Sequence, residues 1–133
     1  MKASWSSACT EFVHLKGSDK YPYSHKEYLE RLRGSLFGLC LAGYGKKCHR
    51  EIECMAMGCV PCVAPEVDMD SYAVPPVEGV HYLRVAGPEE LLQKTEAMGE
   101  AEWEAMSVAG SIWWKENASA EGMWGLTKKL AGL

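Results

Sequence analysis

Apolar residues form several short runs along the chain, and each run predicts a strand. Residues 36–42 are continuously apolar and end at a glycine-rich turn, which is typical of a strand buried on both faces of a parallel sheet. Residues 59–65 have the same character. Residues 79–85 alternate between polar and apolar positions and predict a strand nearer to an edge, and residues 12–15 predict one further strand.

The segments between these runs have helical spacing and helix-capping residues. Ser24, followed three residues later by Glu27, is a capping-box pattern at the start of a helix. The helix expected after the glycine-rich turn has Ile52, Met55 and Ala56 on one face. The pattern therefore predicts helices over residues 25–33, 46–58, 88–98, 100–116 and 122–130.

This order of strands and helices predicts an α/β fold. Strands joined through helices form right-handed crossovers and give a parallel sheet flanked by helices, so we expect a Rossmann-like domain. Residues 25–133 are expected to form this domain, and residues 1–24 a partly irregular N-terminal segment. Because ligands of such sheets bind at the carboxyl ends of the strands, the loops after Ala42, Ala64 and Val85 should share one functional edge.

Composition and charge narrow the possible functions. The chain has 133 residues, of which 47% are hydrophobic, and it carries 14 Lys and Arg against 18 Asp and Glu, for a formal net charge of −4. This acidic balance argues against non-specific binding of nucleic acid. No apolar run reaches the roughly 18 residues that span a bilayer, and the N-terminus lacks the apolar core of a signal peptide. We therefore expect a cytoplasmic protein without a transmembrane segment.

The glycine-rich turn is the first candidate site. Backbone N–H groups of a glycine turn can approach an anion, the following helix N-terminus favours negative charge, and lysine and arginine side chains add cationic donors. The spacing matches neither a P-loop nor the dinucleotide-binding fingerprint, so a tight turn with solvated lysines is the alternative. The candidate anion-binding residues are Gly43, Tyr44, Gly45, Lys46, Lys47 and Arg50.

Arg50 and Glu53 form the second candidate site. They are three residues apart and therefore lie on the same face of the expected helix. Arg50 can bind a phosphate group through two donors, and Glu53 can accept hydrogen bonds from vicinal hydroxyl groups, as a ribose with a diphosphate requires. The alternative is an ordinary salt bridge on a solvated helix face.

Six cysteines raise the question of a metal or redox site. Cys59 and Cys62 form a CxxC motif, with Cys48 and Cys54 nearby, but this motif begins a buried strand, whereas redox CxxC motifs begin a helix. A zinc site would need a second cysteine pair at knuckle spacing, which Cys54 and Cys59 do not supply. We therefore expect buried structural thiols and no bound metal.

Two further features each have a functional and a structural interpretation. His81, at a strand end, is either a catalytic base or a packed edge residue. Trp113, Trp114 and Trp124 are expected to pack within the terminal helices rather than to form a site.

A longer pattern of residues connects the candidate sites. A helix with Tyr-Leu is followed by a strand with Ser-x-Phe-x-Leu, a glycine loop, and then Arg-x-x-Glu-x-Met-x-x-Gly-x-x-Pro. The residues in this pattern are Tyr28, Leu29, Ser35, Phe37, Leu39, Gly43, Gly45, Arg50, Glu53, Met55, Gly58 and Pro61. The pattern resembles the donor-binding half of a GT-B glycosyltransferase, nearest to the exostosin-like and group 1-like enzymes, and the resemblance covers most of residues 21–130.

The resemblance implies a nucleoside diphosphate sugar as substrate, without a separate cofactor and without a metal. Arg50 would contact the diphosphate and Glu53 the ribose hydroxyls. The glycine loop would approach the phosphate or the sugar, and Lys46 or Lys47 would share the charge. A GT-B enzyme has two Rossmann-like domains, so this chain would need an acceptor-binding domain in cis or in trans. The alternative is a non-catalytic Rossmann-like binding or interaction module.

Overall fold

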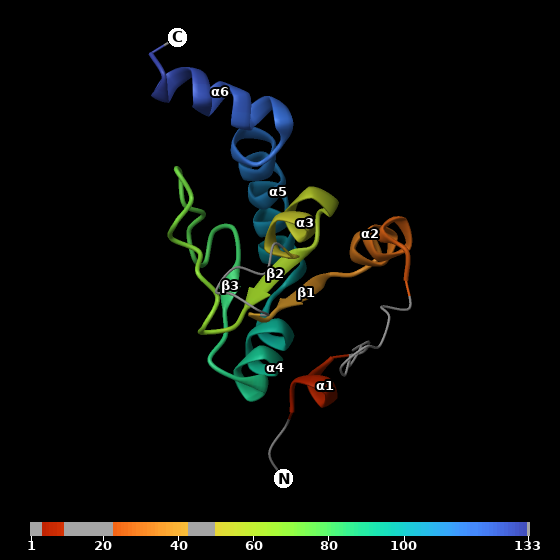
Figure 1. Cartoon of the computed structure of the whole chain (residues 1–133). Helices are drawn as coiled ribbons and strands as arrows, with labels where there is room; N and C mark the ends of the chain where they lie inside the picture. Colours follow the sequence, from red (N-terminus) through yellow and green to blue (C-terminus); the bar gives the residue numbers. More distant parts are fainter. Residues whose placement is uncertain (1–3, 10–22, 43–49, 133) are drawn as a thin grey trace.

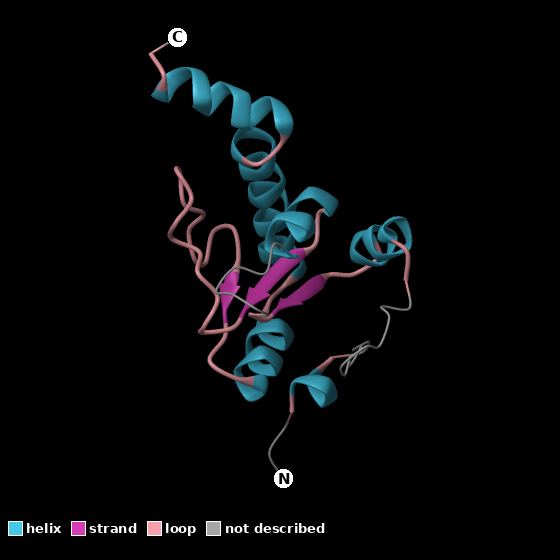
Figure 2. Ribbon diagram, viewed as in Figure 1, coloured by secondary structure: helices cyan, strands magenta, loops and turns pink. Residues whose placement is uncertain are grey.

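Three parallel strands form the central sheet of the protein (Figures 1 and 2). The computed structural model describes residues 4–9, 23–42 and 50–132. The strands are β1 (Phe37–Cys40), β2 (Val60–Val63) and β3 (Leu83–Arg84), and β2 lies between the other two. Phe37 pairs with Val60, and Cys62 pairs with Leu83. The predicted α/β class with a parallel sheet is confirmed, whereas the strand predicted at residues 12–15 lies outside the described residues.

Helices precede, separate and follow the strands. They are α1 (Trp5–Ala8), α2 (His25–Arg33), α3 (Arg50–Met57), α4 (Pro88–Ala97), α5 (Glu100–Asn117) and α6 (Ala120–Leu130). The helices predicted from the sequence are confirmed within the described residues, whereas residues 46–49 of the helix predicted over residues 46–58 lie outside them. Ser24 Oγ accepts a hydrogen bond from the N–H of Glu27 at 3.2 Å, so the predicted cap of α2 is present. The sequence did not predict α1, a single turn capped by Ser4.

The sheet has helices on both faces (Figure 1). On one face lie α2, α3 and the second half of α5, where Cys40, Met55 and Trp113 belong to one buried core. On the other face lie α1 and α4, where Val60 and Leu91 belong to a second core. This is the helix-covered parallel sheet that the sequence predicted.

Helix α5 crosses the edge of the sheet at which β1 and β2 begin. Trp103 Nε1 donates a hydrogen bond to the carbonyl oxygen of Leu36, just before β1, at 2.8 Å. Ser107 Oγ donates to the carbonyl oxygen of Gly58, just before β2, at 2.7 Å. The amino ends of the two strands are therefore covered, and the candidate site is to be sought at their carboxyl ends.

The buried face of α3 differs from the predicted one. Glu51, Cys54 and Met55 are buried, whereas Ile52 and Ala56 are only partly buried. The cause is the neighbouring strand, because the glycine in the middle of β1 has no side chain and the Cys54 sulfur lies where its Cβ would be. Helical spacing cannot reveal this contact, which directs Cys54 rather than Ile52 toward the sheet.

The third strand is shorter than the predicted range of residues 79–85, although its position at the edge of the described sheet is confirmed. The chain forms a turn first: the N–H groups of Val80 and His81 bond to the carbonyl oxygen of Val77 at 3.1 and 2.9 Å. Gly79 takes a φ of +81°, a conformation that glycine adopts without strain. Polar and apolar residues alternate in this turn as they would in a strand.

Helix α6 projects away from the sheet at the C-terminal end of the protein (Figure 1). It packs against α5, and no residue in it is buried. Trp113 on α5 is 4% exposed, as predicted for a packed residue. Trp124 on α6 is 57% exposed, so its predicted packing is wrong. Among the described residues, no helix has both the length and the apolar character needed to cross a membrane.

Candidate functional site

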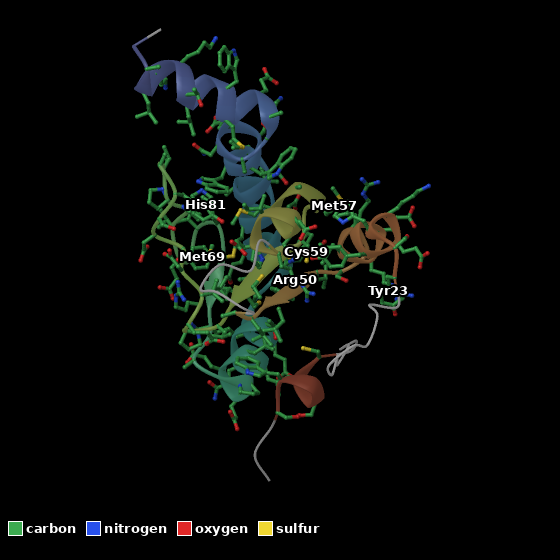
Figure 3. The ribbon with its side chains drawn as sticks, in the orientation of Figure 1. Tyr23, Arg50, Met57, Cys59, Met69 and His81 are labelled. Atoms are coloured by element: carbon green, nitrogen blue, oxygen red, sulfur yellow. The ribbon has the colours of Figure 1, made fainter. Side chains whose placement is uncertain are left out.

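Arg50 is the first residue of α3 and lies near the carboxyl end of β1 (Figure 3). Its Nη1 donates a hydrogen bond to the carbonyl oxygen of Leu39 in β1 at 3.3 Å. Its guanidinium carbon lies 5.4 Å from the centre of the Tyr28 ring, at the distance of a cation–π contact. The arginine is therefore held between β1 and α2, at the edge of the sheet where ligands of parallel sheets bind.

Glu53 lies one turn later on α3 and contacts the same tyrosine. Tyr28 Oη donates a hydrogen bond to Glu53 Oε1 at 3.4 Å, and His25 Nδ1 lies 4.0 Å from Glu53 Oε2. The Glu53 side chain is 30% exposed, so it remains accessible to a ligand. Because Tyr28 contacts both side chains, the prediction that Arg50 and Glu53 lie on one side of the helix is confirmed.

Tyr28 was named from the sequence only as part of the GT-B-like pattern, and His25 was not singled out. Burial raises the pKa of Tyr28 well above its ordinary value, an effect that the charge of Arg50 reduces. The hydroxyl group therefore stays protonated and can donate to Glu53. His25 and Tyr28 are three residues apart on α2, and this spacing of two polar rings is the signal that could have identified them.

The structure describes two of the predicted site residues, Arg50 and Glu53, and brings them to the same side of α3. The remaining predicted site residues belong to the segment between Ala42, which follows β1, and Arg50. The predicted anion-binding residues that lie outside the described part of the chain are Gly43, Tyr44, Gly45, Lys46 and Lys47.

Arg84, which the sequence analysis did not single out, holds the loop that follows β2. Its Nη1 donates hydrogen bonds to the carbonyl oxygens of Ala64 at 2.9 Å and of Val67 at 3.0 Å. Lys94 Nζ in turn donates to the carbonyl oxygen of Arg84 at 2.7 Å. The carboxyl ends of β2 and β3 are tied together by these bonds, as expected for loops that share one edge. A cation at the last position of a strand is the sequence signal for this role.

A buried carboxyl group stands at the start of α3. Glu51 is 1% exposed, and the hydroxyl group of Tyr72 donates a hydrogen bond to its Oε1 at 2.7 Å. The Tyr72 ring meets the Trp113 ring edge-on, with 5.2 Å between the ring centres. These contacts connect the candidate site, the loop after β2 and α5. An acidic residue in the first turn of a helix is ordinarily exposed, so the sequence carried no signal for this burial.

Replacing Tyr72 by phenylalanine is expected to lower the free energy of unfolding by about 1–3 kcal/mol, because the buried carboxyl group of Glu51 loses a hydrogen bond. Urea unfolding measures the effect. The single variants Tyr72→Phe and Glu51→Gln and the double variant form a thermodynamic cycle. A coupling energy of zero in that cycle would contradict the contact.

The described cysteines are free thiols. Cys40, Cys54, Cys59 and Cys62 are buried, as predicted, whereas Cys48 lies outside the described residues. Burial raises the pKa of Cys62 to about 12, so this group stays a thiol at neutral pH. Within residues 4–9, 23–42 and 50–132, no three His, Cys, Asp or Glu side chains are grouped so that they could hold a metal ion.

His81 has a structural contact. Its Nδ1 accepts a hydrogen bond from the N–H of Val77 at 2.8 Å and so closes the turn before β3. Partial burial lowers the pKa of His81, which keeps the ring neutral at pH 7 and Nδ1 able to accept. Of the two interpretations that the sequence left open, this geometry favours the packed residue.

The described residues of the site combine a cation with an accessible hydrogen-bond acceptor. Arg50 offers a planar set of N–H donors suited to phosphate, and Glu53, about one helical turn away, offers oxygens suited to hydroxyl groups. Tyr28 contacts both and limits how far their side chains can move. No family model, no curated protein and no solved structure matches the chain.

Proposed function

We propose that this chain binds a nucleoside diphosphate sugar and is the donor-binding half of a GT-B glycosyltransferase. The observation that carries the proposal is the arrangement of Arg50 and Glu53 on one side of α3, beside the carboxyl end of β1. In this proposal Arg50 binds the diphosphate and Glu53 accepts hydrogen bonds from the ribose hydroxyls. The resemblance of the sequence pattern to GT-B donor domains supports the same roles.

The arginine suits a diphosphate for two reasons. Its guanidinium group presents N–H donors in one plane, which matches two phosphate oxygens at once. It also stands in the first turn of α3, where the helix dipole favours an anion. Gly43, Tyr44, Gly45, Lys46 and Lys47 are proposed to complete the anion site, as the resemblance implies.

Catalysis is proposed to be electrostatic. When the bond between sugar and phosphate breaks, negative charge develops on the departing nucleoside diphosphate, and cationic donors already in place stabilise that charge. Arg50 would supply this stabilisation, and no metal is invoked. The acceptor would be held by a second domain, present in cis or in trans.

The proposal is tested by titration calorimetry with a panel of uridine, guanosine, cytidine and adenosine diphosphates. One of them is expected to bind, and Arg50→Ala is expected to weaken that binding by about 10- to 100-fold, because charged hydrogen bonds to the diphosphate are lost. Arg33→Ala is the matched control, since Arg33 is an exposed arginine of α2. Binding that Arg50→Ala leaves unchanged would contradict the proposal.

Inorganic pyrophosphate separates the two proposed roles. Arg50→Ala should weaken both pyrophosphate and the nucleotide, whereas Glu53→Gln should weaken the nucleotide alone, because pyrophosphate has no ribose. A Glu53→Gln variant that binds both ligands like the unchanged protein would remove Glu53 from the ribose site.

A non-catalytic interaction module is the second candidate function. It is favoured by the apolar residues that α6 leaves exposed, which are Met123, Trp124 and Leu130. Unlike the transferase, such a module would bind no nucleotide and would form a stable complex with another chain. The calorimetric panel therefore distinguishes the two functions.

A further inference from the structure

The end of α3 is built as a Schellman motif. The N–H of Cys59 bonds to the carbonyl oxygen of Cys54 at 2.9 Å, and the N–H of Gly58 bonds to that of Met55 at 3.3 Å. Gly58 has a φ of +78°, the left-handed conformation that this motif requires. In such motifs the residue just after the glycine, here Cys59, frequently makes a hydrophobic contact with the helix residue whose carbonyl oxygen accepts its N–H, here Cys54. Here both of these residues are cysteines.

The sulfur atoms of Cys54 and Cys59 lie close together against β1. A Cβ built on Gly38 would stand 3.2 Å from the Cys59 sulfur and closer still to the Cys54 sulfur. Thiol hydrogen bonds join Cys54 to both Cys59 and Cys40. Gly38 thus provides the space in which the two thiols meet.

The two thiols differ in acidity because of their hydrogen bonds. The bonds from Cys40 and Cys59 lower the pKa of Cys54. The bond to Cys54, together with burial, raises the pKa of Cys59. Cys54 is therefore the better nucleophile of the pair, and Cys59 retains its proton.

We infer that Cys54 and Cys59 are a modification site, at which a peroxide converts two thiols into a disulfide that closes the end of α3. Cys54 is 0% exposed and Cys59 is 2% exposed, so the oxidant must be as small as hydrogen peroxide. The direct backbone hydrogen bond holds the two residues near one another, as disulfide geometry requires. This inference is independent of the proposed sugar-donor function.

The reaction balances in two steps. The Cys54 sulfur attacks one oxygen of hydrogen peroxide, the O–O bond breaks, and the second oxygen leaves as water with the thiol proton, which leaves a sulfenic acid on Cys54. The Cys59 sulfur then attacks the Cys54 sulfur, the S–S bond forms, and the sulfenic hydroxyl leaves as water with the Cys59 proton. Each chain loses two hydrogens, and one peroxide becomes two waters.

Cys62 is the natural control. It belongs to the core on the opposite face of the sheet, so it lies apart from the pair although it is equally buried. Cys40 is the competing partner, because it shares a thiol hydrogen bond with Cys54. Peptide mapping distinguishes a Cys54–Cys59 disulfide from one that includes Cys40.

The experiment treats the folded full chain with hydrogen peroxide, blocks the remaining thiols with iodoacetamide in denaturant, and maps disulfides by mass spectrometry without reduction. We expect a Cys54–Cys59 disulfide, reversed by dithiothreitol, in both the unchanged protein and Cys62→Ala. Cys59→Ala should stop at the sulfenic acid on Cys54, which dimedone traps once denaturant exposes the buried sulfur. Thermal unfolding of each variant checks that it is folded.

Two results would overturn the inference. One is a disulfide that joins Cys54 or Cys59 only to other cysteines. The other is full alkylation of both residues after peroxide has oxidised the partly exposed Cys9 of the same chain. Both outcomes are read on the unchanged protein, so they do not depend on whether a variant folds.

Discussion

Replacing Trp113 by alanine is expected to lower the free energy of unfolding by about 3–5 kcal/mol, the range measured when large aromatic side chains are removed from protein cores. Trp113 is 4% exposed and packs edge-on to the ring of Tyr72. Its Nε1 donates a hydrogen bond to the carbonyl oxygen of Val74 at 2.9 Å. Alanine would leave a cavity beneath the loop after β2 and a carbonyl oxygen without its partner.

Trp124→Ala is the matched control for this substitution. Trp124 is 57% exposed on α6, and the Lys128 ammonium nitrogen lies 5.8 Å from its ring centre. Its removal should cost less than about 1 kcal/mol. Urea unfolding of the two variants side by side measures the difference. Equal losses of stability would mean that α6 is packed more tightly than its exposure indicates.

Replacing Gly38 by alanine is expected to lower the free energy of unfolding by about 1–3 kcal/mol, because the added methyl group overfills the core. It would occupy the space of the Cys54 sulfur and come within 3.2 Å of the Cys59 sulfur. Both cysteine side chains are short and buried, so the strand or α3 must move to relieve the overlap.

The double variant Gly38→Ala with Cys54→Ala tests the cause. Removing the Cys54 sulfur makes room for the new methyl group. The double variant should therefore lose less unfolding free energy than the two single variants lose together. Gly87→Ala is the control, because a Cβ there would have only the Glu89 carboxyl oxygen nearby, at 3.7 Å. Losses that simply add would show that the cysteine is not the group that Gly38 accommodates.

The local pattern of residues was sufficient to predict most of the helices and strands. The cap at Ser24 and the proline that begins α4 are signals contained in a few neighbouring residues, and both elements were predicted. The turn before β3 was mistaken for a strand. Hydrogen bonds to Val77 and the positive φ of Gly79 define a turn here. Polar and apolar residues alternate in this turn as they do in a strand, so the alternation could not distinguish the two.

The candidate site was also predictable only in part from the sequence. The spacing of Arg50 and Glu53 places them on one side of a helix whatever surrounds them, so the sequence could pair them. It could not show that Tyr28 of α2 contacts both of these side chains. It also could not show that Glu51 is buried beneath Tyr72, because their contact joins segments that only folding brings together.

By itself the sequence determined the strands and helices and the Arg50 and Glu53 pair, since each depends on spacing within one segment. The order of these elements along the chain then determined the parallel α/β class. Only the tertiary structure decided which face of α3 is buried, which tryptophan is in the core and which cysteines meet. These features depend on contacts between distant segments. The absence of a side chain at Gly38 is the clearest case, because it determines how closely α3 approaches the sheet.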